Sequence, residues 1–168
     1  KPRLVAKGYT QTYGVNYCET FSPVARLTSV RVLISVAVSL NWPLYQLDIK
    51  NAFLHGDLQE EVYMAQPPGY VVSGKDQLVC RLKKTLYGLK QSPRAWFDKF
   101  SSVVLQYGFQ RSTSDHSVFT RRSSSGIIVL IVYVDDIIIS GSDSAGIADL
   151  KVHLSKHFHT KDLGLLRY

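Results

Sequence analysis

An apolar stretch interrupted by two adjacent carboxylates constrains the fold of this chain more than any other feature. Residues 127–140 read IIVLIVYVDDIIIS, with Asp135 and Asp136 between two aliphatic runs. The runs are rich in β-branched residues, lack a 3.6-residue period and lie between Gly126 and Gly141, which is typical of strands rather than of a helix. The sequence therefore predicts a hairpin with two acids at its tip.

Two adjacent carboxylates repel each other, and they lose hydration when a buried hairpin carries them. A divalent cation would neutralise such a pair. For an arbitrary pair of aspartates a solvated polar turn is the commoner explanation, and it stays open here. The apolar flanks on both sides favour a metal site on a rigid sheet.

The composition indicates a folded chain with a preference for polyanions. A chain of 168 residues, 45% of them hydrophobic, is long enough for one domain with a single core. Twenty Lys and Arg against thirteen Asp and Glu give a net charge of +7, which favours nucleic acid as a partner.

Cys18 and Cys80 form no metal or disulfide pattern, so we expect a reducing, intracellular setting. No apolar run approaches the roughly 18 residues of a membrane span, so no membrane partner is expected.

Local signals predict an α+β fold in which helices back an antiparallel sheet. Ser92 followed by Pro93 is typical of a helix start with serine as the N-cap. The predicted elements are a strand and turn within residues 1–17, a helix from Thr28 or Ser29 to about Leu40, a strand at 44–49, short strands near 61–64 and 78–82, a helix from Ser92 to about Gly108, strands at 117–121 and 127–133, a helix from Asp143 or Ser144 to about Phe158, and an exit segment at 161–164.

A third acid, Asp48, lies on the polar side of the strand predicted at 44–49. If this strand neighbours the hairpin, the three carboxylates converge at the spacing of a two-metal site for nucleotidyl transfer. Magnesium suits such a site because it takes oxygen ligands and keeps several waters. An exposed strand position remains the alternative for Asp48 taken alone.

Two acidic motifs resemble those of a known enzyme family. Residues 133–136, YVDD, resemble the YVDD box of reverse transcriptases, and residues 46–58 resemble the first acidic motif of copia-type LTR retrotransposon enzymes. Five further segments fit the same family in order, namely residues 3–9, 19–24, 62–69, 86–96 and 161–164.

The resemblance implies a polymerase palm, with its antiparallel sheet backed by helices, plus part of the fingers. Residues 1–168 would form a fragment of a reverse transcriptase domain, without the thumb and RNase H, cut from a longer polypeptide. The implied activity is RNA-directed DNA polymerase with two Mg²⁺ ions, for which Mn²⁺ could substitute. The implied partners are an RNA or DNA template with primer, dNTPs and the rest of the Pol polyprotein, including integrase and RNase H. The implied location is a cytoplasmic virus-like particle, the nucleus or both.

The resemblance also assigns roles to individual residues. The catalytic, metal-binding residues would be Asp48, Asp135 and Asp136, with the backbone carbonyl of Ile49 as a further ligand. The nucleotide-binding residues would be Arg3, Lys7, Phe53, Tyr87 and Gly88, with Phe53 as the aromatic gate against a ribose 2′-hydroxyl. The nucleic-acid-binding residues would be Lys83, Lys84, Lys90, Gln91, Arg94 and Tyr133.

The charge pattern supports the last group. Residues 81–99 contain six Lys or Arg and one acid, Asp98, and so carry +5 (6 minus 1), as a groove that follows phosphates requires. A solvated charged face remains the alternative for each basic residue, and a core aromatic for Phe53. The five histidines match no standard zinc spacing and are expected to be ordinary polar residues.

Two other functions compete with a polymerase. One is a catalytically inactive nucleic-acid-binding remnant of a decayed element, against which the presence of all three acids and the gate aromatic argues. The other is a different palm-type polymerase, which the YVDD box and the long ordered resemblance disfavour.

Overall fold

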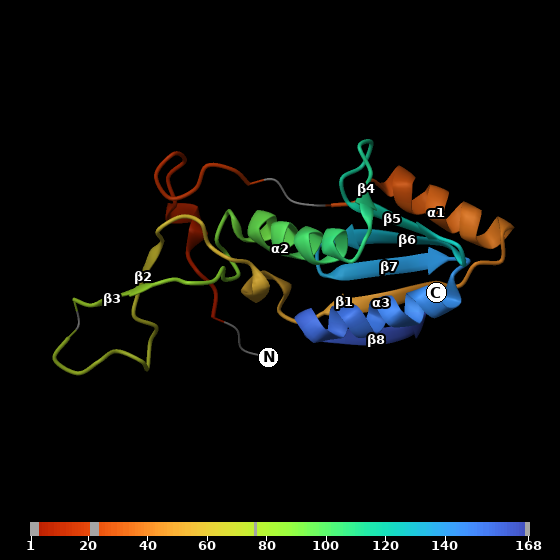
Figure 1. Ribbon diagram of the computed structural model, residues 1–168. Helices are drawn as coiled ribbons and strands as arrows, with labels where there is room; N and C mark the ends of the chain where they lie inside the picture. The colour runs from red at the N-terminus through yellow and green to blue at the C-terminus, as the bar shows by residue number, and fades with distance from the viewer. Residues whose placement is uncertain (1–3, 21–23, 76, 167–168) are drawn as a thin grey trace. The chain divides into compact units, whose positions relative to one another are not determined.

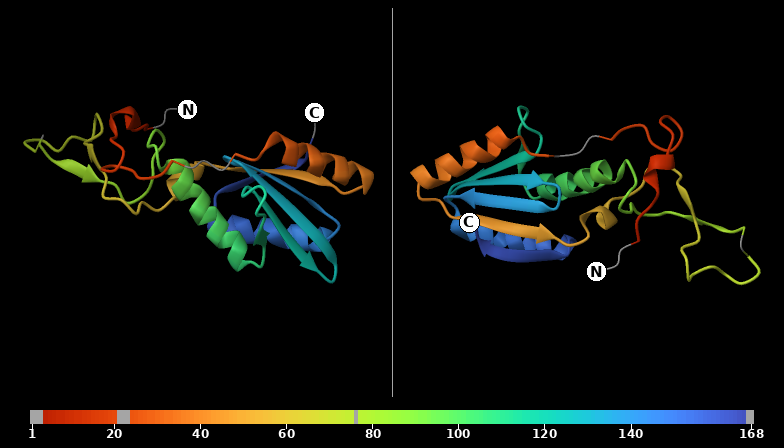
Figure 2. Two further views of the ribbon diagram at one scale, coloured as in Figure 1. Left: turned by 90° about the horizontal axis from the view of Figure 1, so that it is seen from above. Right: turned by 180° about the vertical axis from the view of Figure 1, so that it is seen from behind.

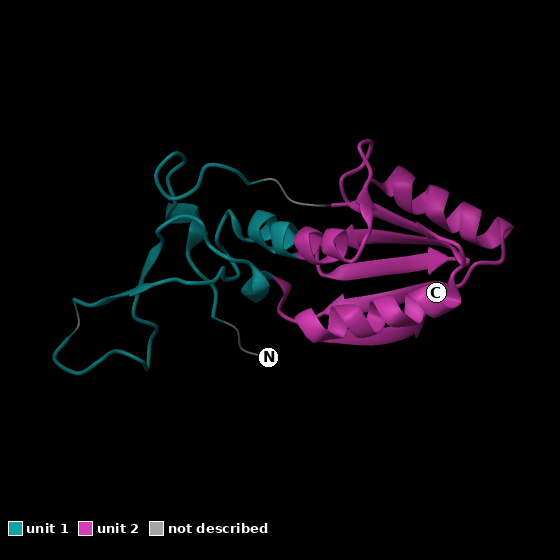
Figure 3. Ribbon diagram, in the orientation of Figure 1, with its two compact units in different colours: residues 1–21, 53–99 teal, residues 22–52, 100–168 magenta. Residues whose placement is uncertain are grey.

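The computed structural model describes residues 4–20, 24–75 and 77–166 (Figure 1). The chain forms two compact units, residues 1–21 with 53–99 and residues 22–52 with 100–168 (Figure 3). Each unit has an apolar cluster of its own. The single core expected from the chain length is therefore wrong.

The second unit is built on a six-stranded antiparallel sheet. Its strands lie in the spatial order β4 (Gln110–Arg111), β5 (Val118–Ser123), β6 (Gly126–Tyr133), β7 (Asp136–Gly141), β1 (Leu44–Ile49) and β8 (Thr160–Leu165). Helices α1 (Leu27–Ser39) and α3 (Ser144–His157) lie on opposite sides of this sheet (Figure 2). The predicted α+β class, with an antiparallel sheet backed by helices, is confirmed.

One face of the sheet forms the main core of this unit. Leu47 and Ile49 of β1 and Ile137 and Ile139 of β7 alternate along their strands and are fully buried or nearly so. Phe100, in helix α2 (Ser92–Gln106), stacks on Phe158 after α3 with ring centroids 5.8 Å apart. Burial of this face explains why these aliphatic residues recur at every second position of β1 and β7.

Helix α1 covers only part of the opposite face. Leu33 of α1 packs in a cluster with Ile131 of β6, and Leu44 and Ile138 lie against that cluster. Because side chains alternate along a strand, Gln46 and Asp48 follow Leu44 on this same face. The polar end of the face therefore lies beyond the cluster that α1 buries.

The start of α1 is capped by a residue from a distant segment. Arg26 is the N-cap residue and makes no side-chain capping bond. The Asp115 carboxylate accepts hydrogen bonds from the backbone N–H of Arg26 (3.0 Å) and the hydroxyl of Ser29 (2.6 Å). The predicted cap at Thr28 or Ser29 is therefore wrong, because a carboxylate brought in by the fold satisfies the free N–H at the helix end.

Of the N-caps predicted for the other two helices, the one of α3 is correct and the one of α2 is wrong. Asp143 caps α3 as predicted, by accepting a bond from the N–H of Gly146 (2.8 Å). At α2 the Ser92 hydroxyl donates to the carbonyl of Leu86 (2.6 Å). The carbonyl of Gln91 accepts the first helical bond, from Ala95 (3.0 Å). The N-cap position is therefore Gln91 rather than Ser92.

The first unit consists mainly of loops around a small apolar cluster. Its regular elements are the 3-10 helices η1 (Gly8–Thr10) and η2 (Ala52–His55), the strand pair β2 (Tyr63–Ala65) and β3 (Val79–Arg81), and the first turns of α2; η2 begins in the second unit. Ala6, Val62 and Leu89 form the cluster. The strand predicted within residues 1–17 is wrong for the described part, because Ala6 bonds to a loop, through the carbonyl of Tyr87 (2.8 Å), and a 3-10 turn follows.

Sequence patterns missed two strands. Residues 161–164 were expected to lead out of the last helix, but they belong to β8, which pairs with β1 at the sheet edge. The two-residue strand β4 is too short to carry a pattern. Across the described ranges, no helix has both the length and the apolar character to cross a bilayer.

The cap of α1 gives a prediction for pH dependence. Burial favours the neutral form of Asp115, but bonds from the Ser29 hydroxyl and the backbone N–H groups of Arg26 and Ser117 outweigh it and hold the pKa below its usual 3.8. Their contribution is complete above about pH 4 and is lost as the pH falls through the lowered pKa. In urea unfolding at pH 7, Asp115→Asn should cost about 1–2 kcal/mol, and the difference from wild type should vanish in strong acid.

An exposed acid of α3, Asp149, provides the control, since Asp149→Asn should leave the unfolding free energy unchanged within about 0.5 kcal/mol. An equal cost of Asp115→Asn at both pH extremes would contradict the role assigned to the carboxylate.

Candidate active site

The structure brings the three predicted acids together at one end of the sheet. Asp48 lies directly opposite Asp136 in the β1–β7 ladder, where such pairs have Cβ atoms about 4.5–5.5 Å apart. Asp135 directly precedes Asp136 in the loop between β6 and β7. Asp48 and Asp136, 88 positions apart in sequence, thus become neighbours through strand register alone.

The hairpin tip is tight and strained. Tyr133 pairs with Asp136 across the hairpin, so only Val134 and Asp135 form the loop. Val134 has a φ of +59°, which a β-branched residue rarely adopts. The carbonyl of Asp135 accepts a hydrogen bond from the backbone N–H of Ile49 (2.8 Å). This bond ties the tip to the end of β1, directly after Asp48.

A row of polar side chains crosses four strands at this end of the sheet. Asp136 pairs with Tyr133 on β6 and with Asp48 on β1, and Asp48 pairs with Lys161 on β8. Directly paired residues have side chains on the same face. The row is therefore Tyr133, Asp136, Asp48 and Lys161, on the face that α1 covers only in part. Tyr133, at 49% exposure, is open to a ligand.

Gln46 is a site residue that the sequence patterns did not single out. Its side-chain N–H donates to Oδ1 of Asp136 (2.9 Å). Gln46 lies opposite Ile138, so Asp136 is its diagonal neighbour across the ladder, within reach of a long side chain. A signal did exist, since Gln46 precedes Asp48 by two residues and so shares its face.

The donor set of this site suits a hard divalent cation. Three carboxylates offer only oxygen ligands, and one of them is already oriented by Gln46. Among the described residues, no group of three His, Cys, Asp or Glu side chains is arranged closely enough to hold a metal ion. Magnesium sites commonly use one or two carboxylates with substrate phosphates and waters, and the Asp48–Asp136 pair fits that kind of site. The role predicted for the Ile49 carbonyl stays a prediction.

Four of the five predicted nucleotide-binding residues, Lys7, Phe53, Tyr87 and Gly88, lie in the first unit. The rings of Phe53 and Tyr87 are in contact, with centroids 4.9 Å apart. The Thr85 hydroxyl donates to the carbonyl of Phe53 and holds that backbone in place. Phe53 is half-buried, so neither the gate nor the core-aromatic interpretation is excluded.

Close backbone packing places Lys7 beside the Tyr87–Gly88 loop. A Cβ on Gly8 would lie 1.8 Å from the carbonyl oxygen of Gly88, and one on Gly88 would lie 2.1 Å from that of Ala6. Only glycine permits this approach. Lys7 lines a cavity of about 550 Å³ in this unit, together with residues such as Val62. Arg3 lies outside the described residues.

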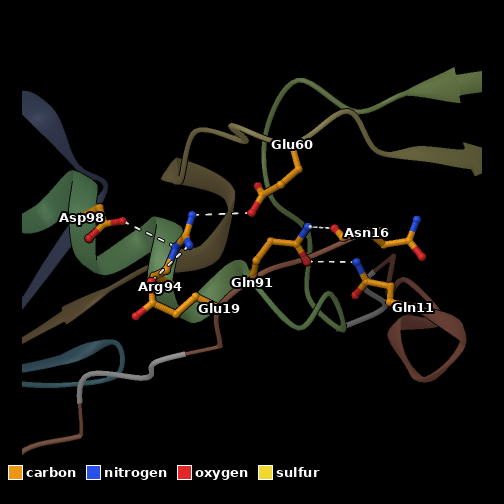
Figure 4. A network of polar contacts seen from close by, with 7 residues as sticks. All are labelled: Gln11, Asn16, Glu19, Glu60, Gln91, Arg94 and Asp98. Carbon is orange, nitrogen blue, oxygen red and sulfur yellow. Dashed lines mark hydrogen bonds and ion pairs between the residues drawn. The ribbon is translucent and has the colours of Figure 1, made fainter. Parts of the chain in front are cut away.

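The structure changes the interpretation of the basic segment at 81–99. Arg94 lies within 4 Å of three acids, Glu19 (3.4 Å), Glu60 (3.5 Å) and Asp98 (3.8 Å), as Figure 4 shows. Lys84 is paired with Asp57. These two cations thus already have carboxylate partners in the protein, whereas the sequence predicted that they contact nucleic acid.

Gln91, another predicted nucleic-acid contact, is fully buried. Its amide accepts a bond from the side chain of Gln11 (2.9 Å) and donates to the carbonyl of Asn16 (3.0 Å), so it fastens the N-terminal segment to the start of α2 (Figure 4). In this structure the Gln91 side chain therefore contacts other parts of the protein and is not exposed to a ligand. Lys90 lies against the Tyr17 ring (4.8 Å to the centroid), whereas Lys83 is exposed.

Comparison with known proteins decides the family. The pattern of the family described as "Reverse transcriptase (RNA-dependent DNA polymerase)" matches residues 1–168. The chain belongs to the reverse transcriptase family. The resemblance to copia-type enzymes is confirmed as well, because the similar proteins include plant transposon Pol polyproteins. Reverse transcriptases use divalent metal ions, in agreement with the donor set above.

Two relatives are plant proteins and one is from yeast. The chain is 50% identical over 165 residues to the retrovirus-related Pol polyprotein from transposon TNT 1-94 of Nicotiana tabacum, a match that covers 98% of this chain and 12% of that protein. It is 48% identical over 168 residues to the Pol polyprotein from transposon RE1 of Arabidopsis thaliana, covering 100% and 12%. It is 30% identical over 171 residues to the transposon Ty1-H Gag-Pol polyprotein of Saccharomyces cerevisiae, covering 98% and 9%. The chain thus spans about 12% of the length of these plant relatives. No solved structure matches the chain significantly.

The glycine packing of this reverse transcriptase chain gives a second prediction. Gly88 and Gly69 both have positive φ, but a Cβ on Gly69 would meet no atom within 4 Å. Gly69→Ala should therefore cost only about 1 kcal/mol of conformational strain. Gly88→Ala should cost at least about 2 kcal/mol more, because it also forces Ala6 and Gly88 apart. Urea unfolding followed by circular dichroism measures both, and equal costs would show that the close approach is absent.

The Gln46–Asp136 bond gives a third prediction. Gln46→Leu removes the donor that orients the Asp136 carboxylate while it keeps a side chain of similar size. We expect about tenfold weaker Mn²⁺ binding, as for other residues that orient metal ligands, measured by electron paramagnetic resonance in the presence of dATP. Gln106→Leu, at an exposed position of α2, is the matched control and should bind Mn²⁺ as wild type does. Unchanged Mn²⁺ affinity in Gln46→Leu would rule out this orienting role.

Proposed function

We propose that this chain is the polymerase portion of a transposon Pol polyprotein and copies element RNA into DNA. The observation that carries the proposal is the register pair of Asp48 with Asp136, next to Asp135, in a chain that matches the reverse transcriptase family over its whole length. In the proposed reaction the enzyme adds deoxynucleoside monophosphates to a primer 3′ end, and pyrophosphate leaves.

The acids would hold two Mg²⁺ ions, for which Mn²⁺ could substitute. Bound there, the ions would activate the 3′-hydroxyl and neutralise the charge that develops on the triphosphate and the leaving oxygen. Asp48, Asp135 and Asp136 are the residues that would hold the ions, with the Asp136 carboxylate oriented by Gln46. The strained tip at Val134 and the bond from Ile49 to Asp135 keep these carboxylates pre-positioned.

The residues of the first unit would bind the incoming dNTP. Phe53, braced by its contact with Tyr87, would block a ribose 2′-hydroxyl, and Lys7, beside Gly88, would contact the triphosphate. Lys83 and Tyr133 are exposed and suited to contact nucleic acid. Lys84 and Arg94 could do so only by exchanging a carboxylate partner for a phosphate.

The partners and the location follow as further parts of the proposal. The plant relatives are Pol polyproteins of which this chain matches 12%, so the chain would work beside the remaining Pol segments, integrase and RNase H. Its substrates would be an RNA or DNA template with primer and dNTPs. We propose that it acts in a cytoplasmic virus-like particle, in the nucleus or in both.

A catalytically inactive, nucleic-acid-binding remnant is not favoured. All three acids are present, and strand register brings them together. Decay of the element would place no constraint on that arrangement.

Primer extension tests the proposed function. The chain, alone and within a longer polypeptide translated from its own coding sequence, is given a primed RNA template, dNTPs and Mg²⁺. We expect primer extension that requires the metal, and a loss of at least about a hundredfold in Asp48→Asn and Asp135→Asn. Asp149→Asn, which changes an exposed acid of α3, should extend as wild type does.

Two results would count against the proposal. Nucleic-acid binding without metal-dependent extension, in both polypeptides, would favour the inactive remnant. Full extension by Asp135→Asn would remove the acids from the catalytic role.

A further inference from the structure

Two histidines of α3 face each other on the side of the sheet opposite the acids (Figure 2). His153 and His157 are four residues apart, so one turn of the helix separates them. Their ring centroids are 4.8 Å apart, with an angle of 52° between the ring planes. The sequence predicted ordinary polar residues here, because no standard set of zinc ligands is present. Neither histidine enters the proposed reaction.

The ring of His153 is held by two residues at the end of α2. The Tyr107 ring stacks on it, with centroids 4.2 Å apart and planes 20° from parallel. The carbonyl of Val103 accepts a hydrogen bond from a ring N–H of His153. The Nε2 atom of His153 is buried and has no hydrogen-bond partner among the described residues, so Nδ1 is the donor. In the neutral ring Nε2 then carries the lone pair.

This arrangement is the one that metal-binding histidines adopt. A histidine that ligates a metal commonly donates its other ring N–H to a backbone carbonyl, which fixes the tautomer and orients the ring. A buried ring nitrogen without a partner is costly, and a bound ion offsets that cost. Two histidines at positions i and i+4 of a helix lie on one face, where zinc-binding helices place them.

The electrostatics around the two rings suit a bound cation. Burial, and then the charges of His157 and Lys156, hold the pKa of His153 below its usual 6.5, so that this ring is neutral at pH 7. A metal ion binds the neutral form of imidazole. His157 is the last residue of α3, where the carbonyl end of the helix favours positive charge.

We propose that His153 and His157 form a binding site for a divalent transition-metal ion such as Zn²⁺. The protein supplies two nitrogen ligands and water completes the coordination, which agrees with the lack of any closely arranged group of three ligating side chains among the described residues. His157 is exposed, so its ring can turn to admit the ion beside Nε2 of His153.

The two histidines and the acids select different ions. Imidazole suits zinc, copper and nickel, whereas Mn²⁺ binds most weakly in the first-row series and Mg²⁺ takes oxygen ligands. A bound Zn²⁺ would link two successive turns of α3 and stabilise the helix behind the sheet. This inference is independent of the proposed function.

A titration of the full chain with Zn²⁺ tests the proposal. Nuclear magnetic resonance follows the ring C–H signals of the histidines, and so reports binding residue by residue. We expect the signals of His153 and His157 to shift together, and the signal of His116, in the loop before β5, to stay unchanged. The midpoint of thermal unfolding should rise with Zn²⁺, because the ion binds the folded chain.

Three variants accompany the titration. His157→Ala removes the exposed ligand and leaves the stack of His153 on Tyr107 in place. It should lower the Zn²⁺ affinity at His153 at least about tenfold, as loss of a residue that merely orients a ligand already does, and abolish the rise in the midpoint. His116→Ala, at an exposed position, should bind Zn²⁺ as wild type does. Asp48→Asn should leave the shifts of both α3 histidines unchanged, because the acids lie on the other face.

Two results would overturn the inference. If Zn²⁺ shifts neither ring, or shifts His153 equally in wild type and His157→Ala, the contact of His153 with Tyr107 serves packing only. If Asp48→Asn removes the shifts, the acids hold the zinc instead. Neither result bears on the proposed function, which primer extension with Mg²⁺ tests separately.

Discussion

The hydrogen bond from the backbone N–H of Ile49 to the carbonyl of Asp135 holds the site in register. It joins the end of β1 to the tip of the β6–β7 hairpin, and it accompanies the pairing of Asp48 with Asp136. Val134 adopts a φ of +59° at that tip, a conformation that costs about 1–3 kcal/mol and persists only where neighbours impose it. The carboxylates are thus placed by backbone geometry rather than by contacts between their side chains.

The same register separates the core from the chemistry. Leu47 and Ile137 point into the core, and their neighbours Asp48 and Asp136 point to the other face. A slip of one residue would bury the acids and expose the aliphatic side chains, so hydrophobic burial itself selects the register that the site needs. The register between β1 and β8 also shifts by one residue, between Gln46 and Leu47. This shift places Lys161 opposite Asp48.

Sequence patterns predicted the parts of the molecule whose cause is local. The hairpin at 127–140, the capping of α3 by Asp143 and the polar face of Asp48 follow from alternation and capping chemistry within a few residues. Features that depend on distant partners were missed or misread. Asp115 caps α1 from 86 positions beyond Ser29, and Arg94 finds acids at 19 and 60 that a local charge count does not include. Polar β8 gave no strand signal, because its pairing with β1 decides its conformation.

The central proposal is that Asp48, Asp135 and Asp136, which strand register brings to one end of the sheet, bind a divalent cation together with substrate phosphates. The most direct measurement is the broadening of backbone amide resonances by substoichiometric Mn²⁺ in the nuclear magnetic resonance spectrum of the chain with dATP. The account predicts that the signals of Asp48, Ile49 and residues 134–136 broaden first, and that Asp48→Asn abolishes the effect. Broadening centred elsewhere, for example on the histidines of α3, or no selective broadening at all, would contradict it.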